Sequence, residues 1–182
     1  MHPPEIPPAV CVIGKKNSGK TTLVVALAAE LGRRGWRIAT IKHGHHDFEM
    51  DEPGRDSWRH FHQGEAHATI MAGAGKIGMV MRIDGEPDPE RLVAEFYAGR
   101  GYHLVLVEGF KMGTLPKIEV FRRAAHHHPV YDPADAENAA RFLALVTDAP
   151  GLDAPFPIIP LDQNAGHVRA VADLLERRFL HG

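Results

Sequence analysis

The stretch "VIGKKNSGKTT", Val12–Thr22, decides the fold. Gly14 is followed by four residues and then by Gly-Lys-Thr at 19–21, which is the spacing of a phosphate-binding P-loop. An apolar run, Ala9–Ile13, precedes the loop and is typical of a strand buried in a parallel sheet. Apolar residues then recur at helical spacing over Lys20–Arg34. Strand, glycine-containing loop and helix in this order predict an α/β fold with a phosphate site at the loop.

Each part of this loop has a physical role in holding phosphate. Gly14 and Gly19 permit backbone angles that turn successive amides towards phosphate oxygens. The helix that begins beside them adds unsatisfied N–H groups and the positive end of its dipole. Lys20 has the length to reach β- and γ-phosphates, and the Thr21 hydroxyl is a ligand for Mg²⁺. The residues expected to bind the nucleotide are Gly14, Lys15, Lys16, Asn17, Ser18, Gly19, Lys20, Thr21 and Thr22.

Strand-like and helix-like segments alternate along the rest of the chain. This alternation predicts a doubly wound, mostly parallel sheet of P-loop NTPase type, with right-handed crossovers. The length of 182 residues fits one domain, 1–182. Further strands are expected within 36–42, 102–110, 117–123, 142–148 and 156–161, and helices within 55–63, 89–97 and 164–180.

Two segments between these elements predict a β-hairpin. "HATIMAG" and "KIGMVMRI" are strand-like and flank Ala74-Gly75, where a turn is expected. An antiparallel hairpin does not fit the scheme of a wound sheet, so we expect it, at about 67–84, to project from the sheet.

Composition and charge exclude several classes of protein. Lys and Arg total 21 against 23 Asp and Glu, and no long basic run is present, so nucleic acid is not an expected partner. The single cysteine, Cys11, lies in an apolar run and is expected to be a buried hydrophobe. The first residues resemble no signal peptide, and no apolar run is long enough to span a membrane. A cytoplasmic protein without membrane contact is therefore expected.

Acidic residues at strand ends are the candidates for a metal site and for catalysis. Glu108 ends the most apolar strand, "LVLVEG", at the edge where ligands bind in this fold class. Asp47 follows another strand and is a second candidate for Mg²⁺ coordination, while the nearby Lys42 and His43 are expected to meet phosphate or an anionic partner ligand. The histidines at 45 and 46 do not favour a transition-metal site, since adjacent residues do not normally face one ion and no cysteine is near.

Two further basic segments leave alternatives open. His126–His128 precede a proline and follow a strand, so a solvated loop is favoured over a site. Arg122 and Arg123 stand at a strand end, where contact with a phosphate and a solvated pair are equally plausible.

Four stretches together carry a family resemblance: "GKKNSGKTTL", "IKHGHHDFEMDEPGRDSWR", "LVLVEGFK" and "PKIEVFR". In order and separation they closely resemble the MobB family of molybdopterin-guanine dinucleotide biosynthesis proteins. A P-loop alone would be shared with many NTPases, whereas the combination is far more specific. The resemblance is strong over residues 10–122 and weaker beyond them.

The resemblance implies a GTP- and Mg²⁺-binding protein with feeble GTPase activity that assists attachment of GMP to molybdopterin. Its implied partners are the molybdenum cofactor guanylyltransferase and molybdopterin-loaded proteins. Family members form homodimers through extended β-structure, which would give the hairpin at 67–84 a purpose. The motif acids carried over from the family are Asp47, Asp56 and Glu108.

How the guanine is recognised and whether the phosphate is cleaved are separate questions. The usual Asn/Thr-Lys-x-Asp string is absent, and Asp148, at the end of "LVTD", is a hypothetical guanine reader by its position. Slow hydrolysis is expected because no glutamine or arginine is clearly placed beside the γ-phosphate; Arg55 is one possibility. The alternatives are a small-molecule kinase that uses ATP, with Asp47 as base, and a non-catalytic interaction module.

Overall fold

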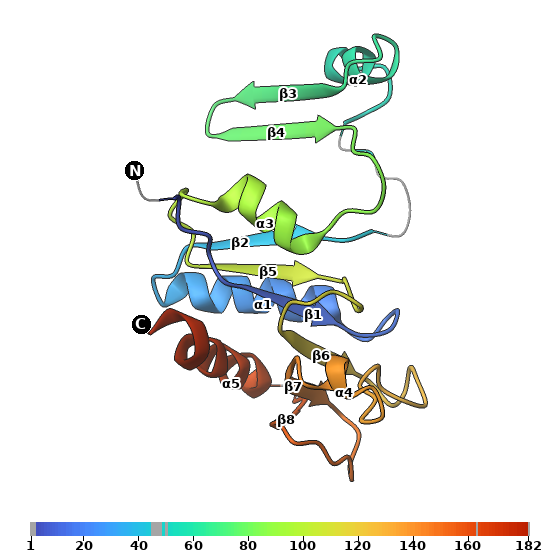
Figure 1. Cartoon of the computed structure of the whole chain (residues 1–182), viewed down its shortest axis with the longest axis vertical. Coiled ribbons are helices and arrows are strands. Elements are labelled where there is room, and N and C mark those ends of the chain that lie inside the picture. Colours follow the sequence, from blue (N-terminus) through green and yellow to red (C-terminus); the bar gives the residue numbers. More distant parts are fainter. Residues whose placement is uncertain (1–2, 45–48, 50, 163, 182) are drawn as a thin grey trace. The chain divides into compact units, whose positions relative to one another are not determined.

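The computed structural model of the chain describes residues 3–44, 49, 51–162 and 164–181 (Figure 1). The chain divides into two compact units. The sheet unit comprises Met1–His43 and Asp88–Gly182, and the hairpin unit comprises Gly44–Pro87. Within the described part of the chain, no helix has both the length and the apolar character needed to cross a membrane.

The sheet unit is built on six parallel strands in the order β2-β5-β1-β6-β7-β8. The first strand thus lies between two strands that come much later in the chain. Such a reversal of strand order creates a crevice at the carboxyl ends of the strands. The elements are β1 Ala9–Ile13, α1 Lys20–Arg33, β2 Ile38–Lys42, α3 Pro89–Tyr97, β5 Leu104–Glu108, β6 Lys117–Phe121, α4 Ala136–Ala139, β7 Phe142–Thr147, β8 Ile158–Pro160, α5 Gly166–Leu175 and a π-helical turn Glu176–Leu180.

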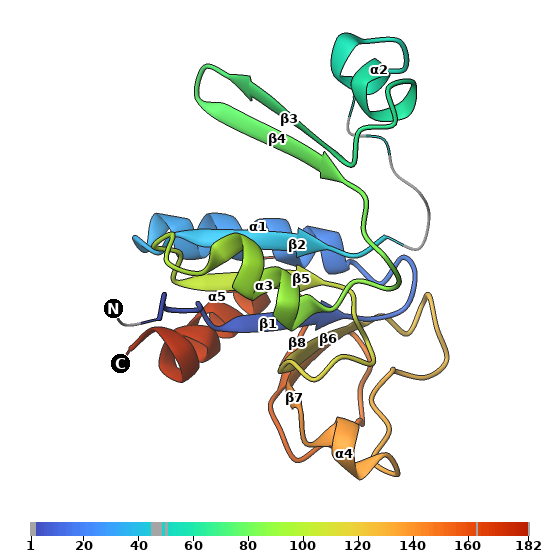
Figure 2. The same ribbon diagram turned by 45° about the horizontal axis from the view of Figure 1, so that its top comes forward.

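Helices cover both faces of this sheet, as Figure 2 shows. Side chains alternate between the faces of a strand, so each central strand contributes to two cores. Val12 packs in one cluster with Leu27 of α1 and Val171 of α5, whereas Ile13 packs in the other with Val93 of α3. Burial on both faces explains why β1 is apolar at every position. The prediction of a doubly wound parallel sheet is confirmed.

Cys11 lies at the centre of this sheet and is fully buried. Burial raises the pKa of its thiol to about 12. The thiol is therefore protonated at neutral pH and behaves as a small hydrophobe, as the sequence indicates.

The sequence predictions differ from the structure mainly at element ends. The second strand begins at Ile38 rather than Trp36, whose indole N–H donates to Glu176 Oε1 over 2.7 Å. The last helix continues from α5 into the π-helical turn. The sequence analysis did not anticipate α4, a single turn at whose start Asp135 accepts from the backbone N–H of Asn138.

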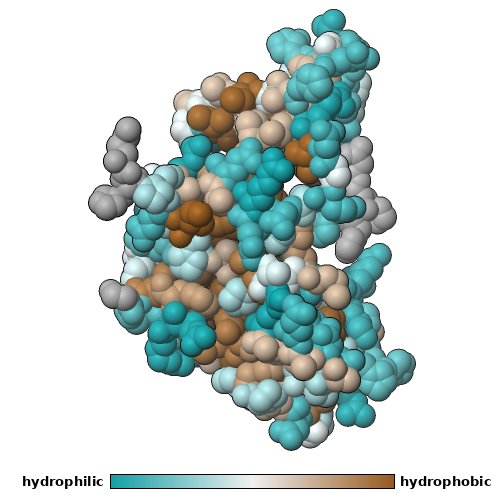
Figure 3. Space-filling model, in the orientation of Figure 1, coloured by the Kyte–Doolittle hydropathy of each residue, from teal (hydrophilic) through white to brown (hydrophobic). Residues whose placement is uncertain are grey.

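The hairpin unit contains α2 (Asp56–His62), β3 (Ala68–Gly73) and β4 (Lys76–Met81). The two strands pair antiparallel, and Gly75 takes the positive φ of +81° that the tight turn requires. The predicted hairpin is confirmed. Of its two faces, one bears the exposed Ile70 and Ile77, and Figure 3 shows apolar side chains gathered over this part of the chain.

Candidate functional site

The loop of residues 14–19, between β1 and α1, contains three residues with positive φ angles. Gly14, Asn17 and Gly19 have φ values of +149°, +62° and +98°. A Cβ atom on Gly14 would lie 2.4 Å from the carbonyl oxygen of Val120, so no side chain fits there. The glycine at this position therefore lets the loop pass close to β6.

The start of α1 has no side-chain cap among the described residues. The N–H of Leu23 donates to the carbonyl of Gly19 over 3.0 Å. The Ser18 hydroxyl is buried and has no hydrogen-bond partner among the described residues. The N–H groups at the start of a helix and a buried hydroxyl fit an anion such as phosphate.

Thr21 and Glu108 meet beside this loop. The Thr21 hydroxyl donates to Glu108 Oε1 over 2.7 Å, and Glu108 is 8% exposed. Their approach follows from the sheet register, in which Glu108 of β5 lies opposite Val12 of β1. A hydroxyl and a carboxylate are the oxygen ligands that Mg²⁺ uses next to phosphates, so these two residues would hold the ion.

Cations surround the carboxylate. Lys42 Nζ lies 3.8 Å from Glu108 Oε1, and Lys20 Nζ donates to the Lys15 carbonyl over 2.8 Å. Partial burial lowers the pKa of Lys20; the cations of Lys111 and Lys42 lower it further, while Glu108 opposes them. Three lysines around one acid leave a positive field that suits a polyphosphate.

Arg122, for which the sequence left phosphate contact and a solvated pair open, is exposed and lies next to the 14–19 loop. Its side chain helps to line a cavity of about 410 Å³, and a Cβ atom on Gly19 would lie 3.6 Å from its Nε. The guanidinium thus stands beside the 14–19 loop. The residues that line this cavity are Asn17, Gly19, Lys20, Thr21, Thr22 and Arg122.

The remaining predicted residues lie in different places. The His43 ring stacks on Phe110 with centroids 4.2 Å apart, and its backbone N–H donates to the Glu108 carbonyl. Asp148 is exposed after β7 and accepts from the backbone N–H of Arg123 over 2.8 Å. Asp56 is the first residue of α2 in the hairpin unit.

The predicted acid Asp47 lies outside the described residues. Among the residues that are described, no group of three or more His, Cys, Asp or Glu side chains is arranged to hold a metal ion.

The sequence analysis missed the contacts of the segment that follows β6. His127 and His128 are exposed, as expected for a solvated loop. However, Lys15 Nζ donates to the His128 carbonyl over 2.7 Å, and His126 Nε2 lies 2.6 Å from the Lys16 carbonyl oxygen. The segment therefore lies against the 14–19 loop.

Glu119 fixes the far end of this segment. It is 1% exposed and accepts hydrogen bonds from the backbone N–H groups of Val130 and Tyr131. Burial raises the pKa of its carboxyl, and the two backbone donors oppose that shift. The sequence signal for this role is an acid inside a strand that is buried on both faces.

The strand order, the loop between β1 and α1 and the acid at the end of β5 define an α/β protein of P-loop NTPase type. The chain belongs to the MobB family, described as molybdopterin guanine dinucleotide synthesis protein B, whose model matches residues 9–148.

Named relatives support this assignment. The chain is 38% identical over 126 residues to the molybdopterin-guanine dinucleotide biosynthesis adapter protein of Escherichia coli, a match that covers 67% of this chain and 70% of the relative. For the adapter protein of the same name from Haemophilus influenzae, the identity is 36% over 118 residues, with 64% of each chain covered. The family resemblance found in the sequence is thus confirmed.

Solved structures extend the likeness to nearly the whole chain. The MobB protein homolog from Bacillus stearothermophilus has a TM-score of 0.66 at 25% identity, and the match covers 93% of this chain and 99% of that one. Bacillus subtilis MobB has a TM-score of 0.67 at 25% identity, with 92% and 97% covered.

Proposed function

We propose that the chain binds GTP with Mg²⁺ at the 14–19 loop and acts as an adapter in the synthesis of molybdopterin guanine dinucleotide. The observation that carries the nucleotide site is the 2.7 Å contact between Thr21 and Glu108 at the head of α1. It joins the metal-binding hydroxyl of a P-loop to the acid of a neighbouring strand. The adapter role rests on the names of the relatives, which describe biosynthesis adapter proteins. The proposed partners are the guanylyltransferase that joins GMP to molybdopterin and proteins that carry molybdopterin.

We propose further that hydrolysis of GTP is slow. Rapid phosphoryl transfer needs both charge stabilisation at the γ-phosphate and a group that orients the attacking water. Arg122 can supply charge, but among the described residues lining the cavity none is a glutamine. The turnover number is therefore expected to lie below about 1 per second. Asp148 remains a proposed guanine reader.

Calorimetric titration with GTP and with ATP, each with and without Mg²⁺, tests the nucleotide proposal. We expect Mg²⁺-dependent binding of GTP that ATP does not reproduce. In Lys20→Ala the affinity is expected to fall by about a hundredfold, because a charge-assisted contact to the phosphates is lost. Arg91→Ala removes an exposed cation of α3 and serves as the control.

Equal or tighter binding of ATP would contradict the GTP proposal and favour a kinase that phosphorylates a small molecule. Retention of full GTP affinity in Lys20→Ala would contradict the assignment of the loop as the phosphate site.

We also propose that two copies associate through the hairpin as a homodimer. Ile70 is 63% exposed and Ile77 is 75% exposed, and Met81 on the same face is 37% exposed. Contiguous apolar side chains on an open two-stranded sheet are typical of a surface that another chain covers.

Ile77→Asp is expected to shift the protein from dimer to monomer in analytical ultracentrifugation. Because the interface is symmetric, the substitution would bury one unpaired carboxylate from each protomer, and the cost of burying both charges opposes association. Because Ile77 is exposed in the single chain, the fold of each protomer, measured by circular dichroism, is expected to stay unchanged. Val25→Asp places the same charge on the exposed side of α1 and is the matched control. An unchanged dimer in Ile77→Asp would exclude this face as the interface.

A further inference from the structure

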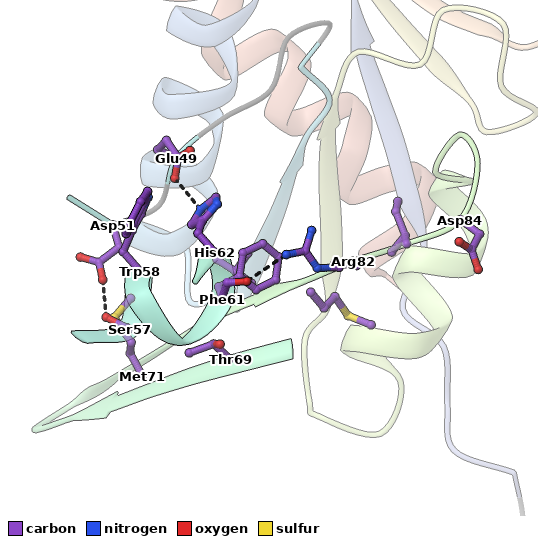
Figure 4. A pocket seen from close by; sticks show the side chains of 13 residues that line it. Glu49, Asp51, Ser57, Trp58, Phe61, His62, Thr69, Met71, Arg82 and Asp84 are labelled. Atoms are coloured by element: carbon purple, nitrogen blue, oxygen red, sulfur yellow. Dashed lines mark hydrogen bonds and ion pairs between the residues drawn. The ribbon is translucent and has the colours of Figure 1, made fainter. Parts of the chain in front are cut away.

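The hairpin unit holds a pocket of its own, with a volume of about 580 Å³ (Figure 4). Its lining comes from α2, from β3 and β4 and from the segments next to them. Phe61, Met71 and Val80 supply apolar walls, and Trp58 stacks on His62 with ring centroids 4.6 Å apart. A volume of this size, lined by aromatic and aliphatic side chains with polar groups among them, is typical of small-molecule sites.

Two polar atoms of the lining residues lack hydrogen-bond partners. Trp58 Nε1 and Thr69 Oγ1 are both shielded from solvent, and neither bonds to any residue in the described part of the chain. Buried donors and acceptors are nearly always paired in native proteins, so two orphans beside one pocket call for an explanation. Because both atoms are shielded, a polar ligand in the pocket would restore the missing bonds once the Trp58 and Thr69 side chains turn towards it.

The charges around the pocket select the kind of ligand. Glu49, Asp51 and Asp84 line it, and a hydrogen bond from Ser57 lowers the pKa of Asp51, which therefore stays ionised. The guanidinium of Arg82 is engaged with Phe61, donating to its carbonyl over 2.9 Å and lying 4.4 Å from the centre of its ring. An acidic lining repels phosphate and favours a neutral or cationic ligand that donates hydrogen bonds.

Part of the lining comes from a stretch that the nucleotide site does not use. Ser57 and Trp58 belong to "PGRDSW", which carries part of the family resemblance, yet they lie in the hairpin unit. The proposed P-loop chemistry gives Ser57 and Trp58 no role, and the pocket supplies one.

We propose that the pocket binds a planar 2-amino-4-oxo heterocycle, the ring edge that guanine and pterin share. The proposal rests on the proposed function, because the family's product contains both rings. The ring N–H and the adjacent amino group match the two oxygens of one carboxylate. The ring nitrogens and oxygen can accept from the Trp58 N–H and the Thr69 hydroxyl, while the apolar walls cover the ring faces.

Calorimetric titration of the full chain with pterin and with guanosine tests the proposal. Neither probe carries phosphate, so the P-loop contributes no phosphate contact. The matched analogues are lumazine and xanthosine, in which an oxo group replaces the 2-amino group. We expect pterin or guanosine to bind one site per chain about tenfold more tightly than its analogue, since one hydrogen bond to a charged group is lost. Binding of pterin would identify the pterin ring as the ligand of the pocket, and binding of guanosine would identify the guanine ring.

Thr69→Val separates a ligand contact from a structural role. It keeps the shape of the side chain and removes the unpaired hydroxyl, so the unfolding temperature should stay the same or rise. Affinity for the ring is expected to fall about tenfold, while GTP affinity is unchanged. Thr40→Val, at an exposed position of β2, is the control and should alter neither.

Three results would overturn the proposal. They are no binding of either ring up to about 1 mM, equal binding of the dioxo analogues, and loss of ring binding in Lys20→Ala, which would place the ring at the P-loop. If the ring binds to the wild type but GTP does not, the pocket stands and only the P-loop proposal fails.

Discussion

Glu108→Gln is expected to weaken Mg²⁺-dependent GTP binding by about thirtyfold, the cost of losing one charged contact to the metal site. Without Mg²⁺ the same substitution is expected to leave binding unchanged or to tighten it. The effect on affinity differs between the two conditions because the negative Glu108 attracts Mg²⁺ when the ion is present but repels the negative phosphates when it is absent. Lys42, 3.8 Å from its carboxylate, would then face the phosphates without an opposing acid.

Paired titrations with Mg²⁺ and with EDTA measure this difference directly. Glu95→Gln, which removes an exposed carboxylate of α3, has the same change in net charge and is the control. Weaker binding to an equal extent in both conditions would mean that Glu108 supports the fold of the loop rather than the metal.

Gly14→Ala is expected to destabilise the sheet unit by about 3 kcal/mol or more and to abolish GTP binding. The added Cβ would lie 2.4 Å from the Val120 carbonyl oxygen and 2.6 Å from Ser18 Oγ. The first contact is with backbone of a buried strand, which cannot rotate away. Relief requires the loop to move away from β6, and the backbone N–H groups of the proposed phosphate site move with it.

Chemical denaturation and calorimetry measure the two effects. Gly32→Ala is the matched control, because a Cβ there meets nothing within 4 Å and the residue lies inside α1. Alanine favours the helix over glycine, so this variant is expected to gain about 0.5 kcal/mol. Similar stability in the two variants would contradict the close approach of the loop to Val120.

Most of the sheet unit could be predicted from the sequence because its strands are buried on both faces. An uninterrupted apolar run such as Ala9–Ile13 has one stable environment, and its observed bounds match the predicted ones. The helix at Pro89–Tyr97 was equally clear, since a proline opens it. The structure adds a cap by Asp88, which accepts from the backbone N–H of Arg91. Ends set by tertiary contacts were less predictable, as Trp36 shows by its bond to Glu176.

The candidate site was predictable only in part. Local spacing identified the loop and its lysine, and the acid at the end of β5 followed from the rule that ligands meet strand ends. Arg122 remained ambiguous, because its role depends on β6 lying next to β1. The contacts of His126 and His128 with the loop could not be predicted, since they join residues more than 100 positions apart.

The sequence alone determined the class of fold, the phosphate loop and the family, because backbone conformation, glycine positions and apolar periodicity are local properties. Only the tertiary structure decided which side chains meet. It paired Thr21 with Glu108, set Arg122 beside Gly19 and anchored the histidine segment through the buried Glu119. At the hairpin pocket it left the Trp58 indole N–H and the Thr69 hydroxyl without a hydrogen bond to any described residue. Those outcomes depend on strand order and on the packing of α2 against β3, which join residues that are distant in the chain.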